Sequence, residues 1–153
     1  MMIEDKIKEL GFELPEPTKP MAAYIPSIKT GNYIFTAGQV PFVKGELKYK
    51  GRVGSDLTLE EAQKAAQICA LNCLGVVKSI SGSLENIEQI VKLTVFVCSA
   101  DNFLSQHLVA NGASELLGKI FGEIGKHARS AVGVNALPGG SAVEIEMIVK
   151  VNN

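Results

Sequence analysis

Residues 127–151 read HARSAVGVNALPGGSAVEIEMIVKV, and this stretch indicates both the kind of fold and the kind of site. Two extended runs flank a turn at Leu137-Pro138-Gly139-Gly140, because proline and glycine are typical turn residues. Arg129 lies in the first run and Glu144 in the second, although hydrophobic strands need neither charge. A guanidinium presents a planar fork of donors that fits a carboxylate, and a glutamate can take a proton from water. The two residues together predict a site for a small anionic substrate.

The second run alternates between apolar and mixed positions, which is typical of a strand with two different faces. Its odd positions are all apolar: Val143, Ile145, Met147, Val149 and Val151. Its even positions are mixed: Glu144, Glu146, Ile148 and Lys150. We expect the apolar face to pack against helices and the half-polar face, with Glu144 on it, to meet another subunit and frame a pocket.

The rest of the chain predicts one α+β domain. Residues 1–20 hold a short helix, ended by Gly11, and a proline-rich connector, and residues 21–153 form the single domain. Thr58 and Glu61 have the spacing of a capping box at the start of the first long helix. The expected helices are at 3–10, 59–80 and 104–122, and the last of these turns Leu108, Leu116, Leu117, Ile120 and Phe121 inward. The expected strands are at 22–28, 32–37, 47–53 and 89–98, followed by the two final strands. The strand at 89–98 is expected to be buried on both faces. This order favours a mixed β-sheet with two helices packed on one face.

Composition narrows the functional classes. The 153 residues carry a net charge of −1, from 15 basic and 16 acidic side chains, which gives no general attraction to nucleic acid. No apolar stretch is long enough to span a membrane, and the charged N-terminus does not resemble a signal peptide, so we expect a cytoplasmic protein. The three cysteines, Cys69, Cys73 and Cys98, are expected to be buried, inert thiols, and no metal site is expected.

Several plainer interpretations stay open at this level. Arg129 and Glu144 could form a cross-strand ion pair on a sheet surface. His127 adjoins Arg129 and could touch the pocket, whereas His107 suits a helix end. A local basic run could contact RNA phosphates or simply be solvated; its members are Lys44, Lys48, Lys50 and Arg52.

Five short motifs occur in an order and spacing that resemble one known family. They are GNYIFTAGQVP at 31–41, VFV at 95–97, ARS at 128–130, LP at 137–138 and VEIE at 143–146. Over residues 21–151 the chain is similar to the RidA/YjgF family of enamine/imine deaminases, whose older names are endoribonuclease L-PSP and translation initiation inhibitor. The N-terminal extension, the run Asn111-Gly-Ala-Ser114 and residues 127–134 resemble a YjgF-like branch of that family.

The resemblance implies a chorismate-mutase-like fold and a homotrimer whose sheets face inward, with pockets at the subunit interfaces and no cofactor or metal. It implies that Arg129 holds the substrate carboxylate and that Glu144 orients or activates the hydrolytic water. The other implied pocket residues are Tyr24, Gly38 and Ala131, the last two through backbone groups. His127 is a candidate substrate-binding residue because it adjoins Arg129, and it is expected at the pocket mouth. The chain departs from the family pattern at Ala37, Ala131 and His127, where a serine, a small polar residue or cysteine, and a proline are usual.

The implied reaction is hydrolysis of reactive 2-imino or enamino acids, of the 2-aminoacrylate type, to 2-keto acids and ammonia. Two alternatives belong to other functional classes. The same pocket could bind a small carboxylate metabolite or a partner protein without turnover, or the chain could bind or cleave RNA. An RNA role is the least expected of the three, because no acid/base pair for a ribonuclease is evident in the sequence.

Overall fold

The computed structural model describes residues 1–17 and 23–153, and its centre is a five-stranded mixed sheet. The helices are α1 (Ile3–Glu9), α2 (Leu59–Ser81) and α3 (Gln106–Phe121), with single 3₁₀ turns η1 (Leu84–Asn86), η2 (Gly122–Gly125) and η3 (Pro138–Gly140). The strands are β1 (Ser27–Thr30), β2 (Tyr33–Thr36), β5 (Ile87–Cys98), β6 (Ala128–Val134) and β7 (Val143–Val151), and a separate small hairpin holds β3 (Phe42–Val43) and β4 (Glu46–Leu47).

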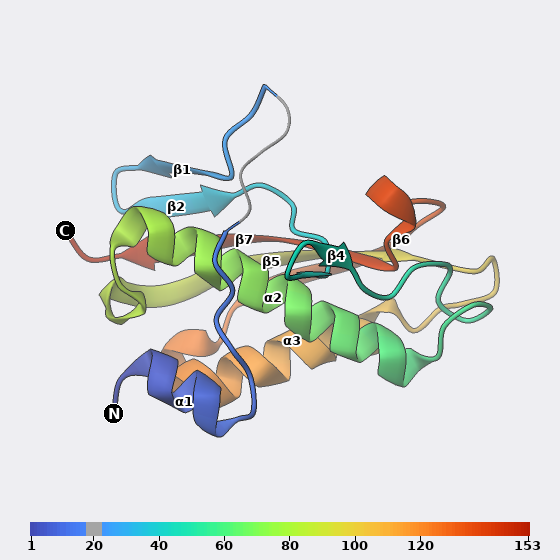
Figure 1. Cartoon of the computed structure of the whole chain (residues 1–153), viewed down its shortest axis with the longest axis horizontal. Helices are drawn as coiled ribbons and strands as arrows, with labels where there is room; N and C mark the ends of the chain where they lie inside the picture. The colour runs from blue at the N-terminus through green and yellow to red at the C-terminus, as the bar shows by residue number, and fades with distance from the viewer. Residues whose placement is uncertain (18–22) are drawn as a thin grey trace.

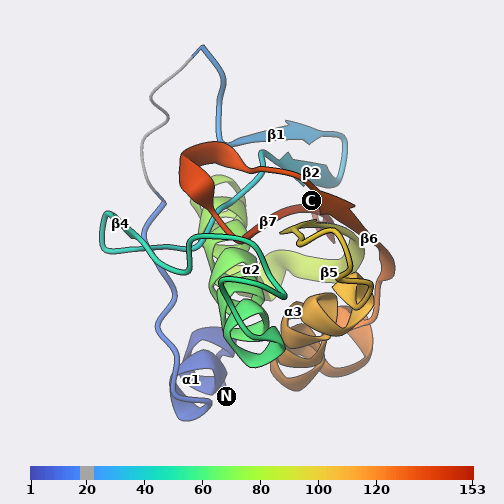
Figure 2. The same cartoon turned by 90° about the vertical axis from the view of Figure 1, so that its right-hand side faces the viewer.

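The strand order is β1-β2-β7-β5-β6. The connection from β2 to β5 therefore passes over the position of β7, and the connection from β6 to β7 passes over β5. β5 and β6 run parallel, joined by α3, and every other pair in the sheet is antiparallel. Helices α2 and α3 cover one face of this sheet, and no α-helix of the described residues covers the other face (Figures 1 and 2). The predicted α+β sheet with two helices on one face is confirmed, and α1 is a third, shorter helix.

Helix α2 forms as its sequence predicts. The Thr58 side chain accepts from the Glu61 backbone N–H, and the Glu61 carboxylate accepts from the Thr58 backbone N–H, which completes the capping box. The helix face toward the sheet is made of small residues, including Ala62, Ala66 and Cys69, so the helix axis lies close to the strands.

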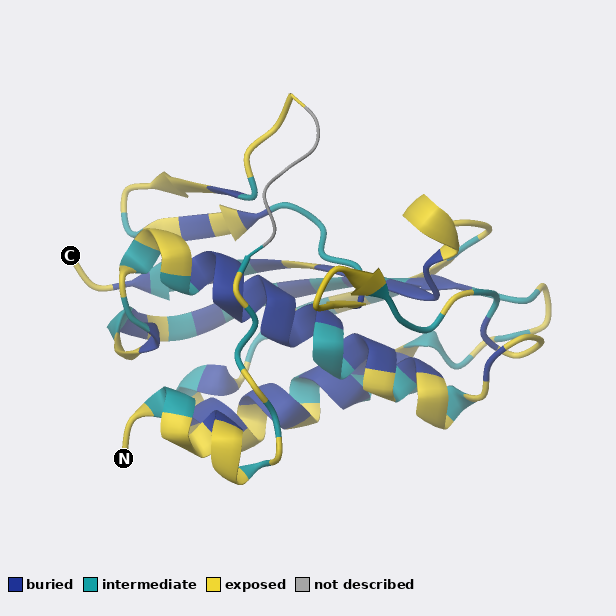
Figure 3. Ribbon diagram, in the orientation of Figure 1, coloured by how far each residue is buried: buried dark blue, intermediate teal, exposed yellow. Residues whose placement is uncertain are grey.

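The two faces of β7 differ as the alternation predicts. All five odd positions from 143 to 151 are buried under the helices. The even positions lie on the open face and are exposed or half-buried (Figure 3). Strand β5 follows the same pattern, which corrects the expectation that it is buried on both faces: a single chain covers only its helix side.

The first and third predicted strands differ from the structure. The first begins at Ser27 and not at residue 22, which lies outside the described residues. The run at 47–53 is not a strand beyond Leu47, because Tyr49 and Gly51 have positive φ angles of 57° and 111°, which interrupt the pleated conformation. Isolated bridges from Lys50 to Ser141 and from Val53 to Ser99 hold this segment instead.

Strands β6 and β7 are not neighbours in the sheet. β5 lies between them, pairing Leu93 with Arg129 on one side and Phe96 with Glu144 on the other. The turn at 137–140 therefore does not close a hairpin, and Arg129 and Glu144 are two strand spacings apart, roughly 10 Å across the sheet. A cross-strand ion pair between them within one chain is excluded.

The N-terminal segment packs on the outside of the helical layer. Ile7 is fully buried and belongs to the main core, and Lys78 of α2 forms an ion pair with Glu4 at 2.8 Å. The carbonyl of Pro15 lies against Gly75, where any Cβ would overlap it. No helix in the described part of the chain has both the length and the hydropathy to cross a membrane.

Helix α3 crosses α2 at a glycine. A Cβ at Gly112 would lie 2.5 Å from the backbone oxygen of Gln63 on α2, so the two backbones touch there. The predicted inward residues Leu116, Leu117, Ile120 and Phe121 are buried. Leu108 is only half-buried, because the helix presents Val109 to the core in its place.

We predict that Gly112→Ala destabilises the protein by about 1–3 kcal/mol, because two packed backbones must separate to admit the new methyl group. Gly118→Ala in the same helix is the matched control, since a Cβ there meets nothing within 4 Å. The control should stabilise the protein by up to about 1 kcal/mol through helix propensity alone. Urea unfolding of the two variants measures both effects, and equal stabilities would contradict the close contact.

Candidate functional site

Arg129 is held in a fixed orientation by helix α3. Its register partner Leu93 faces the helices, so the Arg129 side chain leaves β6 on that same face. Nη1 donates to Oδ1 of Asn111 at 2.8 Å and to Oγ of Ser114 at 3.2 Å. These two bonds use both hydrogens of Nη1. No residue that the structure describes accepts a hydrogen bond from Nε or Nη2, and the edge formed by these two atoms can present two parallel donors to a carboxylate.

Ser114 connects Arg129 to His127. The Nδ1 atom of His127 lies 2.7 Å from the carbonyl oxygen of Gly125, which can only accept, so Nδ1 carries a proton. In the neutral ring Nε2 is then the acceptor, and it lies 2.9 Å from Oγ of Ser114. Burial lowers the pKa of His127, and the nearby Arg129 charge lowers it further, so the ring is neutral near pH 7.

A surface cavity of about 290 Å³ opens beside these side chains. Its lining residues are Ser114, Gly118, Gly125, Lys126, His127 and Arg129. Lys126 also forms an exposed ion pair with Glu123 at 2.7 Å. The cavity therefore holds two cationic groups and two hydrogen-bonding side chains, a set that suits a small anion.

Glu144 belongs to a different surface. It leaves β7 on the open face of the sheet, where it lies half-buried beside Gly38. A Cβ at Gly38 would overlap the Glu144 carboxylate, so glycine makes the room for this group. Burial raises the pKa of Glu144, and repulsion from Glu146 raises it further. A carboxyl with a raised pKa is suited to exchange protons with water nearer to neutral pH.

A bulge places Gly38 beside Glu144. Phe35 pairs with Ile148 and Gln39 with Ile145, so the β2 side has one residue more than the β7 side between these pairs. The Thr36 hydroxyl accepts from the Met147 backbone N–H at 3.0 Å and takes the place of a ladder bond. Gly38 is thereby turned toward the open face, as expected of a site residue.

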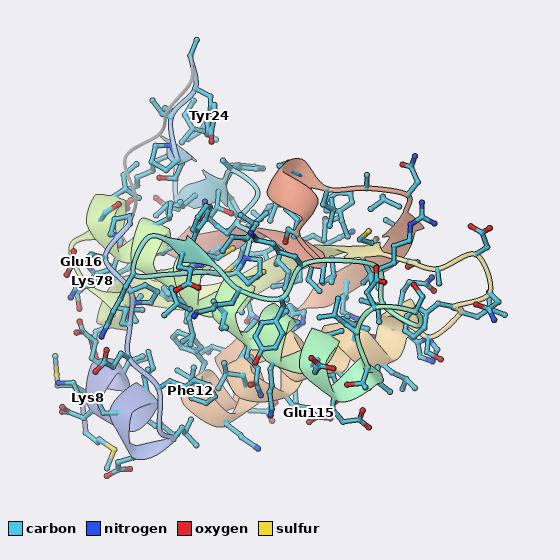
Figure 4. The ribbon with its side chains drawn as sticks, turned by 45° about the vertical axis from the view of Figure 1, so that its right-hand side comes forward. Lys8, Phe12, Glu16, Tyr24, Lys78 and Glu115 are labelled. Atoms are coloured by element: carbon cyan, nitrogen blue, oxygen red, sulfur yellow. The ribbon has the colours of Figure 1, made fainter. Side chains whose placement is uncertain are left out.

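The predicted pocket residues form two groups within one chain. Arg129, Ala131 and His127 lie on or beside β6 at one edge of the sheet, and Ala131 packs partly against the core. Glu144 lies on β7, and Gly38 lies just after β2. Tyr24 precedes β1, at the other edge of the sheet, and 56% of its surface is exposed. Figure 4 shows Tyr24 far from Glu115, the residue after Ser114 on α3. One chain does not bring the six residues together.

Asn111 and Ser114 belong to the candidate site, although the sequence pattern predicts a role for neither. Their spacing of three on a helix places both on the same side of α3, facing Arg129. The spacing of Asn111 and Ser114 predicts a contact with Arg129 only when helix α3 is known to cover β6. Without that packing the sequence does not show which residues bind Arg129.

Other chemical groups in the chain are accounted for structurally. All three cysteines are buried and free, and burial raises the pKa of Cys73 to about 12, so its thiol is inert. No cluster of three or more metal-ligating side chains occurs among the described residues. In the basic run, Lys48 pairs with Glu46 and Arg52 with Asp101, which reduces its attraction to RNA phosphates.

The raised pKa of Glu144 predicts a pH-dependent stability. The unfolded chain loses this proton near the ordinary value of about 4.3, before the folded chain does, so wild-type stability falls as pH rises through the folded pKa. Glu144→Gln removes this loss and should be the more stable protein near neutral pH, with no advantage below the unfolded pKa. Urea unfolding between about pH 4 and pH 7 at fixed protein concentration measures the difference.

Glu115→Gln, on the exposed side of α3, is the control for the loss of one negative charge. An effect that follows from the loss of one charge alone should appear in both variants, so the difference between their curves reports on Glu144. If the Glu144→Gln and Glu115→Gln curves run parallel to each other, the pKa of Glu144 is not raised in the folded protein.

Known proteins resemble this chain over nearly its whole length. Residues 4–150 match the model of the family described as "YjgF/chorismate_mutase-like, putative endoribonuclease". Protein TCP17 of Trypanosoma cruzi is 40% identical over 96% of this chain and 92% of its own length. A crystal structure of a protein of unknown function from Agrobacterium tumefaciens shares 44% identity, with a TM-score of 0.93 over 98% of this chain and 92% of that one.

RidA from an Antarctic Psychrobacter is a more distant structural relative. It shares 28% identity and a TM-score of 0.62, over 89% of this chain and 94% of that one. The predicted fold and the predicted family are both confirmed by these matches. This chain belongs to the YjgF/RidA family and has its chorismate-mutase-like fold.

Proposed function

We propose that the protein hydrolyses reactive 2-imino or enamino acids to 2-keto acids and ammonia. The observation that carries the proposal is the Arg129 guanidinium, fixed through Nη1 and free along its Nε–Nη2 edge at an open cavity. Every 2-imino acid has a carboxylate next to the reacting carbon. A bidentate pair with this edge therefore binds the substrate and orients its imine carbon in one interaction.

Glu144 is the proposed group that activates water. An imine carbon is already electrophilic, so the reaction needs a positioned water and a group that accepts its proton. The raised pKa of Glu144 makes it a stronger base than an ordinary glutamate once it is ionised. Gly38 has no side chain where the Glu144 carboxylate lies, so the carboxylate fits closely against the backbone at this position.

The proposed site lies between subunits, because one chain separates its two halves. The open face of the sheet exposes large apolar side chains, a pattern typical of an interface. They include Ile28, Tyr33, Phe35 and Val132, each at least 40% exposed. We propose a homotrimer in which open faces pack inward and the Glu144 of one subunit completes the Arg129 cavity of the next. Such a cyclic arrangement repeats one site at each interface.

A second candidate function is binding of a small carboxylate metabolite without turnover. The Arg129 half of the site is complete within one chain, since Asn111, Ser114 and His127 are already in place there. An anion can therefore bind to this half without any contribution from Glu144. Stabilisation by pyruvate, with no keto-acid release from imino acids, would favour this function over the first.

Arg129→Ala should lower kcat/KM for freshly generated 2-iminopropanoate by about 100-fold or more, because a desolvated, charge-assisted contact is lost. Glu144→Gln should instead lower kcat by about 100-fold or more with a smaller change in KM, as expected for a general base. Release of the 2-keto acid, coupled to an amino-acid oxidase that supplies the imino acid, measures both. An Arg129→Ala variant with the wild-type rate would end the proposal.

The two inactive variants should rescue each other when they share a trimer. If each site combines Arg129 of one subunit with Glu144 of the next, random mixing of equal amounts restores about one site in four. Co-refolding of Arg129→Ala with Glu144→Gln, followed by light scattering and the keto-acid assay, tests this directly. Mixed trimers without recovered activity would show that both residues act from one chain. The double variant Arg129→Ala/Glu144→Gln, mixed with wild type, controls for subunit exchange.

A further inference from the structure

Four groups are linked by hydrogen bonds in a series that begins at the Arg129 guanidinium and ends at the backbone carbonyl of Gly125. The Arg129 Nη1 donates to Oγ of Ser114, Ser114 donates to Nε2 of His127, and Nδ1 of His127 donates to the carbonyl of Gly125. Only the bond from Arg129 to Ser114 helps to hold the guanidinium in place. Asn111 already accepts a shorter bond from the same Nη1 atom, at 2.8 Å against 3.2 Å for Ser114. The ordered Ser114–His127 pair is more than this anchoring requires.

The pair has the arrangement of an activated hydroxyl. A hydroxyl lies within hydrogen-bond reach of an imidazole nitrogen, and the other imidazole nitrogen is oriented by a third group. Here the third group is the Gly125 carbonyl, which fixes the Nδ1–H tautomer and directs the Nε2 lone pair at Ser114. Ser114, His127 and Arg129 all line the same cavity, so the hydroxyl faces the space in which the proposed substrate carboxylate would pair with Arg129.

We propose that Ser114 and His127 form a proton relay that collapses the tetrahedral intermediate of the deamination. This inference rests on the proposed function. It assigns to the Arg129 half of the site an acid–base group of its own, additional to Glu144. Ser114 is the member that contacts substrate, and His127 acts through it.

The proton transfers balance with these two groups. Water attacks the iminium carbon, its oxygen bonds to that carbon, and one of its protons goes to the Glu144 carboxylate. The carbinolamine hydroxyl then gives its proton to Oγ of Ser114, while the Ser114 proton passes to Nε2 of His127. The carbon–oxygen double bond forms, the carbon–nitrogen bond breaks, and nitrogen leaves with the bonding electrons and the proton from Glu144. Finally ammonia takes the extra proton from His127 and departs as ammonium.

The surroundings of His127 suit a base. The charged groups around it are Arg129 on β6 and the Lys126–Glu123 pair at η2, while α3 presents the uncharged Ser114 and Asn111. Burial lowers the pKa of His127, the bond to the Gly125 carbonyl raises it and the Arg129 charge lowers it, and the net direction is down. The lowered pKa favours the neutral ring, which has a lone pair on Nε2 that can accept a proton.

The test is the pH dependence of kcat for imino-acid hydrolysis. Wild type requires both an ionised Glu144 and a neutral His127, so log kcat should fall with a slope approaching two on the acid side. His127→Asn keeps a donor for the Gly125 carbonyl but has no acceptor at the Nε2 position. Its slope should be one, and its kcat should fall by about 100-fold at neutral pH. Ser114→Ala should match it, and the double variant should be no worse than either single variant.

Two control variants separate the relay from simple anchoring. Asn111→Ala loosens Arg129 and should raise KM while the acid-side slope stays two. Ser114→Thr keeps the hydroxyl and should keep most of the kcat. A Ser114→Ala variant that raises only KM, or that keeps the wild-type slope and kcat, would overturn the relay while Arg129-dependent turnover still supports the deaminase. A wild-type protein with no turnover at any pH would overturn the deaminase itself, and the relay with it.

Discussion

The pairing of β5 with both β6 and β7 is the constraint on which the rest of the molecule depends. β5 is parallel to β6 and antiparallel to β7, and its buried face lies under α2 and α3. A parallel neighbour requires a crossover connection, which α3 provides. This helix is thereby placed over β6, where Asn111 and Ser114 reach Arg129. The same strand separates Arg129 from Glu144, so the topology that builds the candidate anion site also divides the two proposed catalytic residues between two surfaces.

The two half-sites have opposite electrostatic environments. Glu144 is partly buried near another carboxylate, which raises its pKa, whereas His127 is partly buried near a guanidinium, which lowers its pKa. Desolvation acts on both groups in the direction that favours their neutral forms. The proton affinities of an acid and a base are therefore brought closer together than in water. Groups matched in this way exchange protons with little cost, which is a common feature of acid–base sites.

Periodicity predicted those parts of the fold that depend on local pattern. The alternation in β7, the capping box at Thr58 and the buried face of α2 are all properties of residues close in sequence. The segment after Leu47 departs from the predicted strand because its path depends on two positive φ angles and on bridges to residues far along the chain. The face on which Arg129 lies depends on its register with Leu93, and sequence alone does not give that register.

The departures from the family pattern become understandable once α3 is in place. Ala37 and Ala131 lack side chains that could hydrogen-bond to substrate, and Ala131 packs partly against the core. Ser114 supplies a hydroxyl to the Arg129 cavity from α3, and the His127 ring lies next to that hydroxyl. A proline at position 127 would have no imidazole to accept the Ser114 proton. In the proposed relay the Ser114 hydroxyl and the His127 ring therefore act together, and Ser114 reaches Arg129 on β6, across β5 from Glu144.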